Sequence, residues 1–212
     1  MQRFRITYAK THKLRYTGNL DIHKIWERTI RRAGLALAYS QGFHPQPRLH
    51  QASPLPLGMT SRCEMVDLWL TDDAPIMSPE QIQQALGEKA PAGLELLNVE
   101  VIKLDAPALQ TQIAAAEYNV TFLDKIDPAA LHDSTKMILT QSTLIRERRG
   151  KNYDLRPLIL NLQLPQNDPP LLTMQLSACE NATGRADEVL LALNIEPALT
   201  RIERTNLIFK NG

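Results

Sequence analysis

Two kinds of hydrophobic spacing alternate along the chain, and this alternation constrains its fold more than any other feature of the sequence. Residues 2–9 alternate polar and apolar side chains, which is typical of a β-strand with one buried face. Residues 20–33 instead carry apolar side chains at helical spacing, with Trp26 inside the stripe, and Gly34 is suited to end the helix. A strand followed by an amphipathic helix predicts an α+β fold.

The same order of elements is predicted in both halves of the chain. In the first half, strands at residues 64–70 and 94–104 flank a helix that begins at the capping residue Ser78, followed by Pro79. The second half is again predicted to run strand, helix, strand, strand, helix, strand. These elements cover residues 118–122, 127–141, 155–164, 171–178, 186–193 and 200–210, respectively. This β-α-β-β-α-β order predicts two tandem ferredoxin-like modules, residues 1–107 and 114–212.

The first module contains an unusually long loop at residues 40–58, which holds four prolines and two glycines. Because proline cannot donate a hydrogen bond to a central strand ladder, we expect a shaped loop with at most short extended pieces. Loops of this length in compact domains are usually functional. Phe43 and His44 lie in it between Gly42, which lets the backbone turn, and Pro45, which stiffens it. The loop is therefore a candidate binding element.

Composition excludes several classes of protein. No stretch approaches the roughly 18 consecutive apolar residues of a membrane span, and the N-terminus lacks the apolar segment of a secretory signal, so we expect a cytoplasmic protein. The two cysteines, Cys63 and Cys179, are too few for an iron–sulfur cluster or a structural zinc site and are expected to be buried thiols. The sequence also lacks a glycine-rich phosphate loop. It predicts no metal and no small-molecule cofactor.

Charge is distributed unevenly along the chain. Residues 1–62 contain eleven Lys and Arg and two acidic residues, a net charge of +9, whereas residues 63–142 contain four basic and thirteen acidic residues, a net charge of −9. Such segregation favours a surface built for an anionic partner. The alternative is that the two regions neutralise each other within the fold. The sequence leaves both interpretations open.

The basic residues of the first module are expected to form a nucleic-acid surface. Four cations of the predicted helix follow one another at a spacing close to one helical turn, so their like charges are neighbours on the helix surface. Bound phosphates would neutralise this repulsion. The alternative is an ordinary solvent-exposed helix face, which has the same spacing. Phe43 and His44 are expected to stack on unpaired bases, unless Phe43 fills the core beneath its loop. The expected nucleic-acid-binding residues are Arg15, Lys24, Arg28, Arg31, Arg32, Phe43, His44, Arg48, Arg148 and Arg149.

Several motifs together resemble one known family. In the first half they lie at residues 14–21 (LRYTGNLD), 31–40 (RRAGLALAYS), 42–47 (GFHPQP) and 54–64 (PLPLGMTSRCE). In the second half they lie at residues 153–157 (YDLRP), 184–188 (GRADE) and 204–207 (RTNL). With these motifs the chain resembles the radical-SAM-linked proteins, a bacterial family found beside or fused to radical SAM enzymes. One departure is Asn19, where histidine is expected in that family.

The resemblance implies association with a radical SAM enzyme, and the family's gene neighbourhood with a ribonuclease and ribosomal proteins implies RNA. The chain lacks the C-x-x-x-C-x-x-C motif of the enzyme itself. We therefore expect an RNA-binding accessory protein that presents tRNA or rRNA to a partner enzyme. The alternative is a protein–protein adaptor that binds this enzyme through acidic residues 63–142 or an apolar edge. A third hypothesis is a metal-free RNA-processing enzyme, in which His44 near Tyr16 or Tyr39 performs acid–base chemistry.

Overall fold

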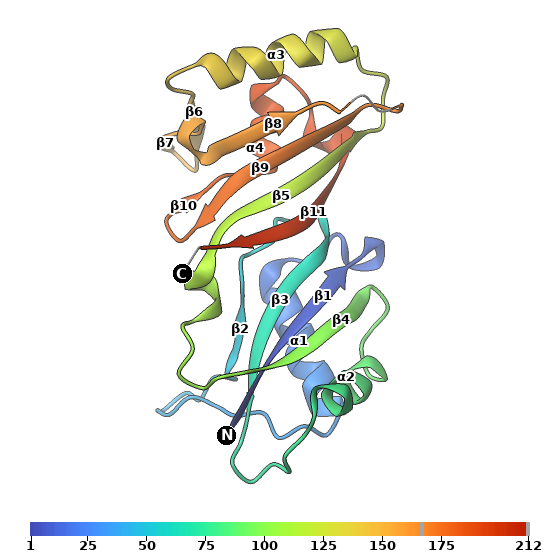
Figure 1. The fold of residues 1–212 in the computed structure, drawn as a ribbon, viewed down its shortest axis with the longest axis vertical. Helices are drawn as coiled ribbons and strands as arrows, with labels where there is room; N and C mark the ends of the chain where they lie inside the picture. The colour runs from blue at the N-terminus through green and yellow to red at the C-terminus, as the bar shows by residue number, and fades with distance from the viewer. Residues whose placement is uncertain (166–167, 211–212) are drawn as a thin grey trace. The chain divides into compact units, whose positions relative to one another are not determined.

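The computed structural model describes residues 1–165 and 168–210, and Figure 1 shows the course of the chain. The chain divides into two compact units, Met1–Ile113 and Ala114–Gly212. Over the described residues it is a mixed α/β protein with four α-helices, and its strands pair mostly antiparallel. Within that part of the chain, no helix is long and apolar enough to span a membrane. Both cysteines are free thiols, and Cys63 is buried whereas Cys179 is half-buried.

The first unit packs two helices against a four-stranded antiparallel sheet (Figure 1). Its elements are β1 (Gln2–Lys10), η1 (His12–Leu14), α1 (Asn19–Arg32), β2 (Leu49–Gln51), β3 (Thr60–Leu70), α2 (Pro79–Gly87), β4 (Leu94–Ile102) and η2 (Leu109–Gln112). The strands lie in the order β2-β3-β1-β4. Leu109 of η2 is fully buried, and the first unit extends to Ile113.

The core of the first unit lies between the sheet and its two helices. β1 places alternate residues, from Phe4 to Tyr8, in this core, as its alternating pattern predicts. Trp26 of α1 is fully buried and meets Tyr8 edge to face, with ring centroids 5.0 Å apart. Ile82 and Leu86 of α2 join the same core. Side chains alternate between the two faces of a strand, so Arg3 and Arg5 of β1 lie on the opposite face of the sheet from this core.

The second unit has the same order of main elements, with a hairpin added. Its elements are β5 (Ile113–Phe122), α3 (Pro128–Thr140), β6 (Ile145–Arg148), β7 (Lys151–Asp154), η3 (Arg156–Leu158), β8 (Ile159–Gln163), β9 (Leu171–Cys179), β10 (Ala182–Thr183), α4 (Ala186–Ala192), η4 (Pro197–Leu199) and β11 (Thr200–Phe209). The sheet has the order β9-β5-β11, and both β8 and β10 pair with β9. Strands β6 and β7 pair with each other as a separate two-stranded sheet.

A hairpin formed by β6 and β7 precedes the strand that the sequence predicts in this region. We expected one strand at residues 155–164, but β8 begins at Ile159 and residues 145–154 form the hairpin. Its turn consists of Arg149 and Gly150, with φ angles of 52° and 74°. Two consecutive residues with positive φ give a tight turn whose twist matches that of antiparallel strands. This turn places the basic residues around Arg149 at the hairpin's end.

Candidate nucleic-acid interface

Helix α1 presents a basic face to solvent. Its apolar stripe is buried against the sheet, and four cations occupy the other side of the helix. These exposed cations are Lys24, Arg28, Arg31 and Arg32. Lys24 Nζ lies 3.9 Å from Asp21 Oδ1, but the two side chains are 64% and 66% exposed, so this pair neutralises little charge. Like charges at this spacing cost a few tenths of a kcal/mol per pair, which a phosphate-bearing partner would relieve.

The loop that follows α1 forms a narrow hairpin at residues 38–48. Its arms are joined by backbone hydrogen bonds from Ser40 N–H to Gln46 O (2.8 Å) and from Arg48 N–H to Ala38 O (2.8 Å). The Ser40 hydroxyl also accepts a hydrogen bond from the backbone N–H of Gln46 (2.9 Å). At the base, Ala38 N–H donates to the Trp69 carbonyl of β3 (2.7 Å), so the hairpin is attached to the sheet. Residues 41–45 form its exposed tip.

Phe43 stands at this tip with its side chain fully in solvent, at 102% of its reference exposure. The interpretation that Phe43 fills the core beneath the loop is therefore wrong. Its neighbour Gly42 has a φ angle of 133°, which L side chains rarely adopt, so the tip depends on glycine. A phenyl ring left in water forgoes roughly 1.5–3 kcal/mol of burial free energy. The hairpin thus carries an unburied aromatic ring in the same unit as the basic face of α1.

Cations and aromatic rings meet at the base of the hairpin. The guanidinium carbon of Arg48 lies 4.9 Å from the centroid of the Trp69 ring, and the His50 imidazole approaches the same ring edge-on, with centroids 4.9 Å apart. Cation–π contacts of this kind contribute about 0.5–2 kcal/mol, so Arg48 is held in place. Burial, and then the charge of Arg48, lowers the pKa of His50 below its usual value. His50 is therefore mostly neutral at pH 7.

Two of the basic residues of β1 do not contribute to the exposed charge. Arg3 and Arg5 are buried, and both donate hydrogen bonds to the fully buried carboxylate of Asp67. Arg3 also donates to the carbonyls of Lys103 (3.3 Å), Ala106 (2.6 Å) and Pro107 (2.9 Å). For these two arginines, the basic and acidic regions of the sequence neutralise each other within the unit. Their role is to tie β1, β3 and the segment after β4 together.

Arg15 is also buried, which corrects its expected place in the interface. Its side chain is 7% exposed, its Nε donates to the Gly58 carbonyl (2.5 Å), and its guanidinium lies over the Tyr16 ring at 5.2 Å. Lys10 is buried beside it and donates to the carbonyls of Arg15 and Met59, both at 3.2 Å. These contacts hold both cations inside the unit, so Arg15 shapes the segment before α1 instead of presenting charge.

The three residues considered for acid–base chemistry lie on exposed parts of the first unit. Tyr16 is 72% exposed before α1, Tyr39 is 47% exposed on an arm of the hairpin, and His44 is exposed at its tip. Over the described residues, no hydrogen bond joins the His44 imidazole to either phenol. A general base needs a positioned partner within hydrogen-bonding distance. In this structure the three side chains are not joined into a hydrogen-bonded acid–base pair.

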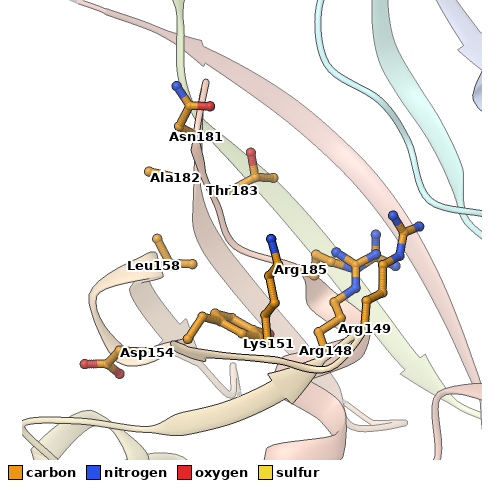
Figure 2. A pocket seen from close by; sticks show the side chains of 10 residues that line it. Arg148, Arg149, Lys151, Asp154, Leu158, Asn181, Ala182, Thr183 and Arg185 are labelled. Atoms are coloured by element: carbon orange, nitrogen blue, oxygen red, sulfur yellow. The ribbon is translucent and has the colours of Figure 1, made fainter.

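Arg148 and Arg149 lie in the second unit, at the end of the β6–β7 hairpin. There they line a pocket together with Lys151 and Arg185, shown in Figure 2. Sequence reasoning found the two arginines but missed Arg185, because Arg185 precedes α4 and is far from the hairpin in sequence. It also missed Trp69, whose position on β3 gave no sign that it would hold Arg48. The structure thus locates basic sites in both units.

Comparison with known families places the chain in one of them. A family model described as an uncharacterized protein conserved in bacteria, DUF2344, matches residues 3–190. The chain belongs to this family. The match covers most of both units, including the hairpin at residues 38–48 and the β6–β7 hairpin. No curated protein matches the chain.

Proposed function

We propose that this protein binds RNA through its first unit and presents it to a partner enzyme. The observation that carries the proposal is the fully exposed ring of Phe43 on a hairpin attached to β3. Unpaired bases stack on aromatic side chains in sequence-tolerant fashion, while Lys and Arg neutralise the backbone phosphates. Phe43 supplies the first kind of contact, and the exposed cations of α1 with Arg48 supply the second. The family resemblance supports a radical SAM enzyme as the partner that receives the RNA.

The strand order supports a ferredoxin-like architecture for both units. In the first unit the order β2-β3-β1-β4, and in the second the order β8-β9-β5-β11, follow a β-α-β-β-α-β succession of elements. We infer that the units are two ferredoxin-like modules, the second with the β6–β7 hairpin inserted between its first helix and second strand. On this fold, the proposed RNA surface uses the helix side and a loop of the first module.

Phe43→Ala tests the proposed contact directly. Fluorescence anisotropy with a short unpaired RNA is expected to show a loss of about 1–3 kcal/mol of binding free energy, or roughly 5- to 150-fold in Kd. Because the ring is exposed, the melting temperature should stay within about 1 °C of wild type. Ile76→Ala is the matched control, since Ile76 is an apolar side chain of the same unit and is 93% exposed. Equal RNA affinity of wild type and Phe43→Ala would remove Phe43 from the interface.

A protein–protein adaptor is a second candidate, favoured by strand β4. β4 lies at the end of the strand order in the first unit, and its Leu97 and Val101 are 48% and 61% exposed. An exposed strand edge with apolar side chains is a common docking site for another protein. Replacing both residues with Lys is expected to abolish capture of a radical SAM partner and leave RNA affinity unchanged. Capture that survives the double substitution would exclude this edge.

A further inference from the structure

A positively charged pocket opens in the second unit between the β6–β7 hairpin and the turn that joins β9 to β10 (Figure 2). Its volume is about 500 Å³, within the range of roughly 300–1,000 Å³ typical of small-molecule sites. Figure 2 shows Arg148 and Arg149 extending side by side from the hairpin, with Asn181 and Thr183 across the opening. The cations of the lining are Arg148, Arg149, Lys151 and Arg185. The pocket is therefore suited to an anion.

The hairpin places like charges beside one another. Arg148 pairs with Lys151 directly across the β6–β7 ladder, and Arg149 stands in the turn between them. Like charges at directly opposed positions destabilise a strand pair. In the described part of the chain, no carboxylate forms an ion pair with any of these three side chains. The repulsion among these three cations is therefore not offset by a carboxylate of the described chain, and a bound anion would offset it.

The other charged groups of the lining are already held by the protein. Asp154 Oδ1 accepts hydrogen bonds from the backbone N–H groups of Leu144 (2.7 Å) and Arg156 (2.9 Å), so this carboxylate fixes the base of the hairpin. Asp187 accepts two hydrogen bonds from Arg185, from Nε at 3.0 Å and from Nη2 at 2.5 Å. This bidentate pair orients Arg185 and leaves its remaining N–H groups available to a ligand.

The rest of the pocket offers carbon surface and neutral polar groups. Leu158, Ala182 and the ring of Tyr153 supply the carbon surface, and Asn181 and Thr183 supply polar side chains. Burial, and then the charge of Glu188, raises the pKa of Tyr153, so its hydroxyl stays protonated at neutral pH. A ligand with a compact, multiply charged group and a small uncharged body complements both parts of the lining.

We propose that this pocket binds a nucleotide through its phosphate groups. The three unpaired cations match the charge of a diphosphate, since each terminal phosphate carries about −1.5 to −2 at neutral pH. The carbon surface and the neutral polar groups would contact the sugar and base. The same chemistry occurs in a free nucleoside diphosphate and at the 5′ end of an RNA chain. The site contains neither Phe43 nor α1, so it stands independently of the proposed function.

Isothermal titration calorimetry of the full chain with pyrophosphate, ADP and adenosine tests the site at low ionic strength. Saturable one-to-one binding is expected for pyrophosphate and ADP and not for adenosine. Lys151→Ala and Arg149→Gly are each expected to weaken ADP binding about tenfold or more. Glycine suits the positive φ angle at residue 149, so the turn should be retained. Lys136→Ala on α3, an exposed cation outside the lining, is the matched control and should leave ADP affinity unchanged.

Two oligonucleotides distinguish the sources of the phosphate. Tighter binding of a 5′-diphosphorylated RNA than of the same RNA with a 5′-hydroxyl, lost in Lys151→Ala, assigns the pocket to RNA ends. Binding of ADP with no difference between the two oligonucleotides assigns it to a free nucleotide. The absence of saturable binding to both pyrophosphate and ADP would overturn the proposal. Equal weakening of ADP binding by Lys136→Ala would also overturn it, because the affinity would then reflect overall charge.

Discussion

Replacing Asp67 with Asn is expected to destabilise the first unit by about 3–5 kcal/mol. The carboxylate is fully buried, and its two oxygens accept four hydrogen bonds from the Arg3 and Arg5 guanidinium groups at 2.6–3.1 Å. Asparagine has nearly the same shape, but it carries no charge. Its NH₂ group would also be a hydrogen-bond donor that faces the N–H donors of the guanidinium groups. The Arg3 and Arg5 guanidinium groups would then remain buried without this carboxylate. Removing one partner of a buried ion pair is strongly destabilising, because it leaves an uncompensated charge in the interior.

Thermal unfolding of the full chain, followed by calorimetry, measures this effect. At roughly 2–4 °C per kcal/mol for a chain of this size, the melting temperature should fall by about 6–20 °C. Asp73→Asn is the matched control, because Asp73 is exposed in the same unit, and its effect should stay within about 0.5 kcal/mol. A fall of less than about 2 °C in Asp67→Asn would refute the reasoning. Arg3 and Arg5 would then not depend on Asp67 for their place in the fold.

The remaining predictions concern the basic face, the base of the hairpin and helix α2. Replacing Arg28 and Arg31 with Ala should flatten the slope of log K against log[salt] for single-stranded RNA by about 0.7 per lost phosphate contact, as measured by fluorescence anisotropy; an unchanged slope would remove α1 from the interface. NMR should find that His50 titrates below its model value of 6.5 and moves back toward it in Arg48→Gln. Because the pKa of His50 is lower in the folded state, its contribution to stability is present above pH 6.5 and is lost as the pH falls. A His50 pKa above 6.5 would contradict this pH dependence. Ser78→Ala should cost about 1 kcal/mol by urea denaturation, and a loss below about 0.3 kcal/mol would show that the cap contributes little.

Features set by local sequence could be predicted well. The alternation in β1 places Phe4 and Tyr8 in the core, and the helical spacing of α1 buries Trp26. Helix α2 begins where the sequence predicts it. The Ser78 hydroxyl accepts the Gln81 backbone N–H (3.3 Å), and the Gln81 side chain accepts the Ser78 N–H (2.8 Å). Each of these features depends on residues within a few positions of one another, so a single sequence contains the necessary information.

Features set by tertiary contacts could not be predicted in this way. Counting charges gives residues 1–62 a net charge of +9, but Arg3, Arg5 and Arg15 are buried because residues distant in sequence supply their acceptors. The sequence predicts no hairpin at residues 145–154, because β6 and β7 have only four residues each and their one apolar and one aromatic side chain, Ile145 and Tyr153, do not make an alternating pattern. Its turn residue Arg149 adopts a positive φ angle that favours Asn or Gly. The exposure of Phe43 likewise depends on where its hairpin leaves the sheet.

The salt dependence of RNA affinity tests the central claim most directly. The exposed cations of α1 together with Arg48 would neutralise about five phosphates, which at about 0.7 each gives a log–log slope near −3.5 for single-stranded RNA. Between about 50 and 200 mM salt, the affinity of the wild-type protein for an unpaired RNA should therefore fall by about two orders of magnitude. A slope near zero, or no measurable binding at the lowest salt, would contradict RNA binding by the first unit. Either result would favour an acidic protein as the partner of the basic face of α1.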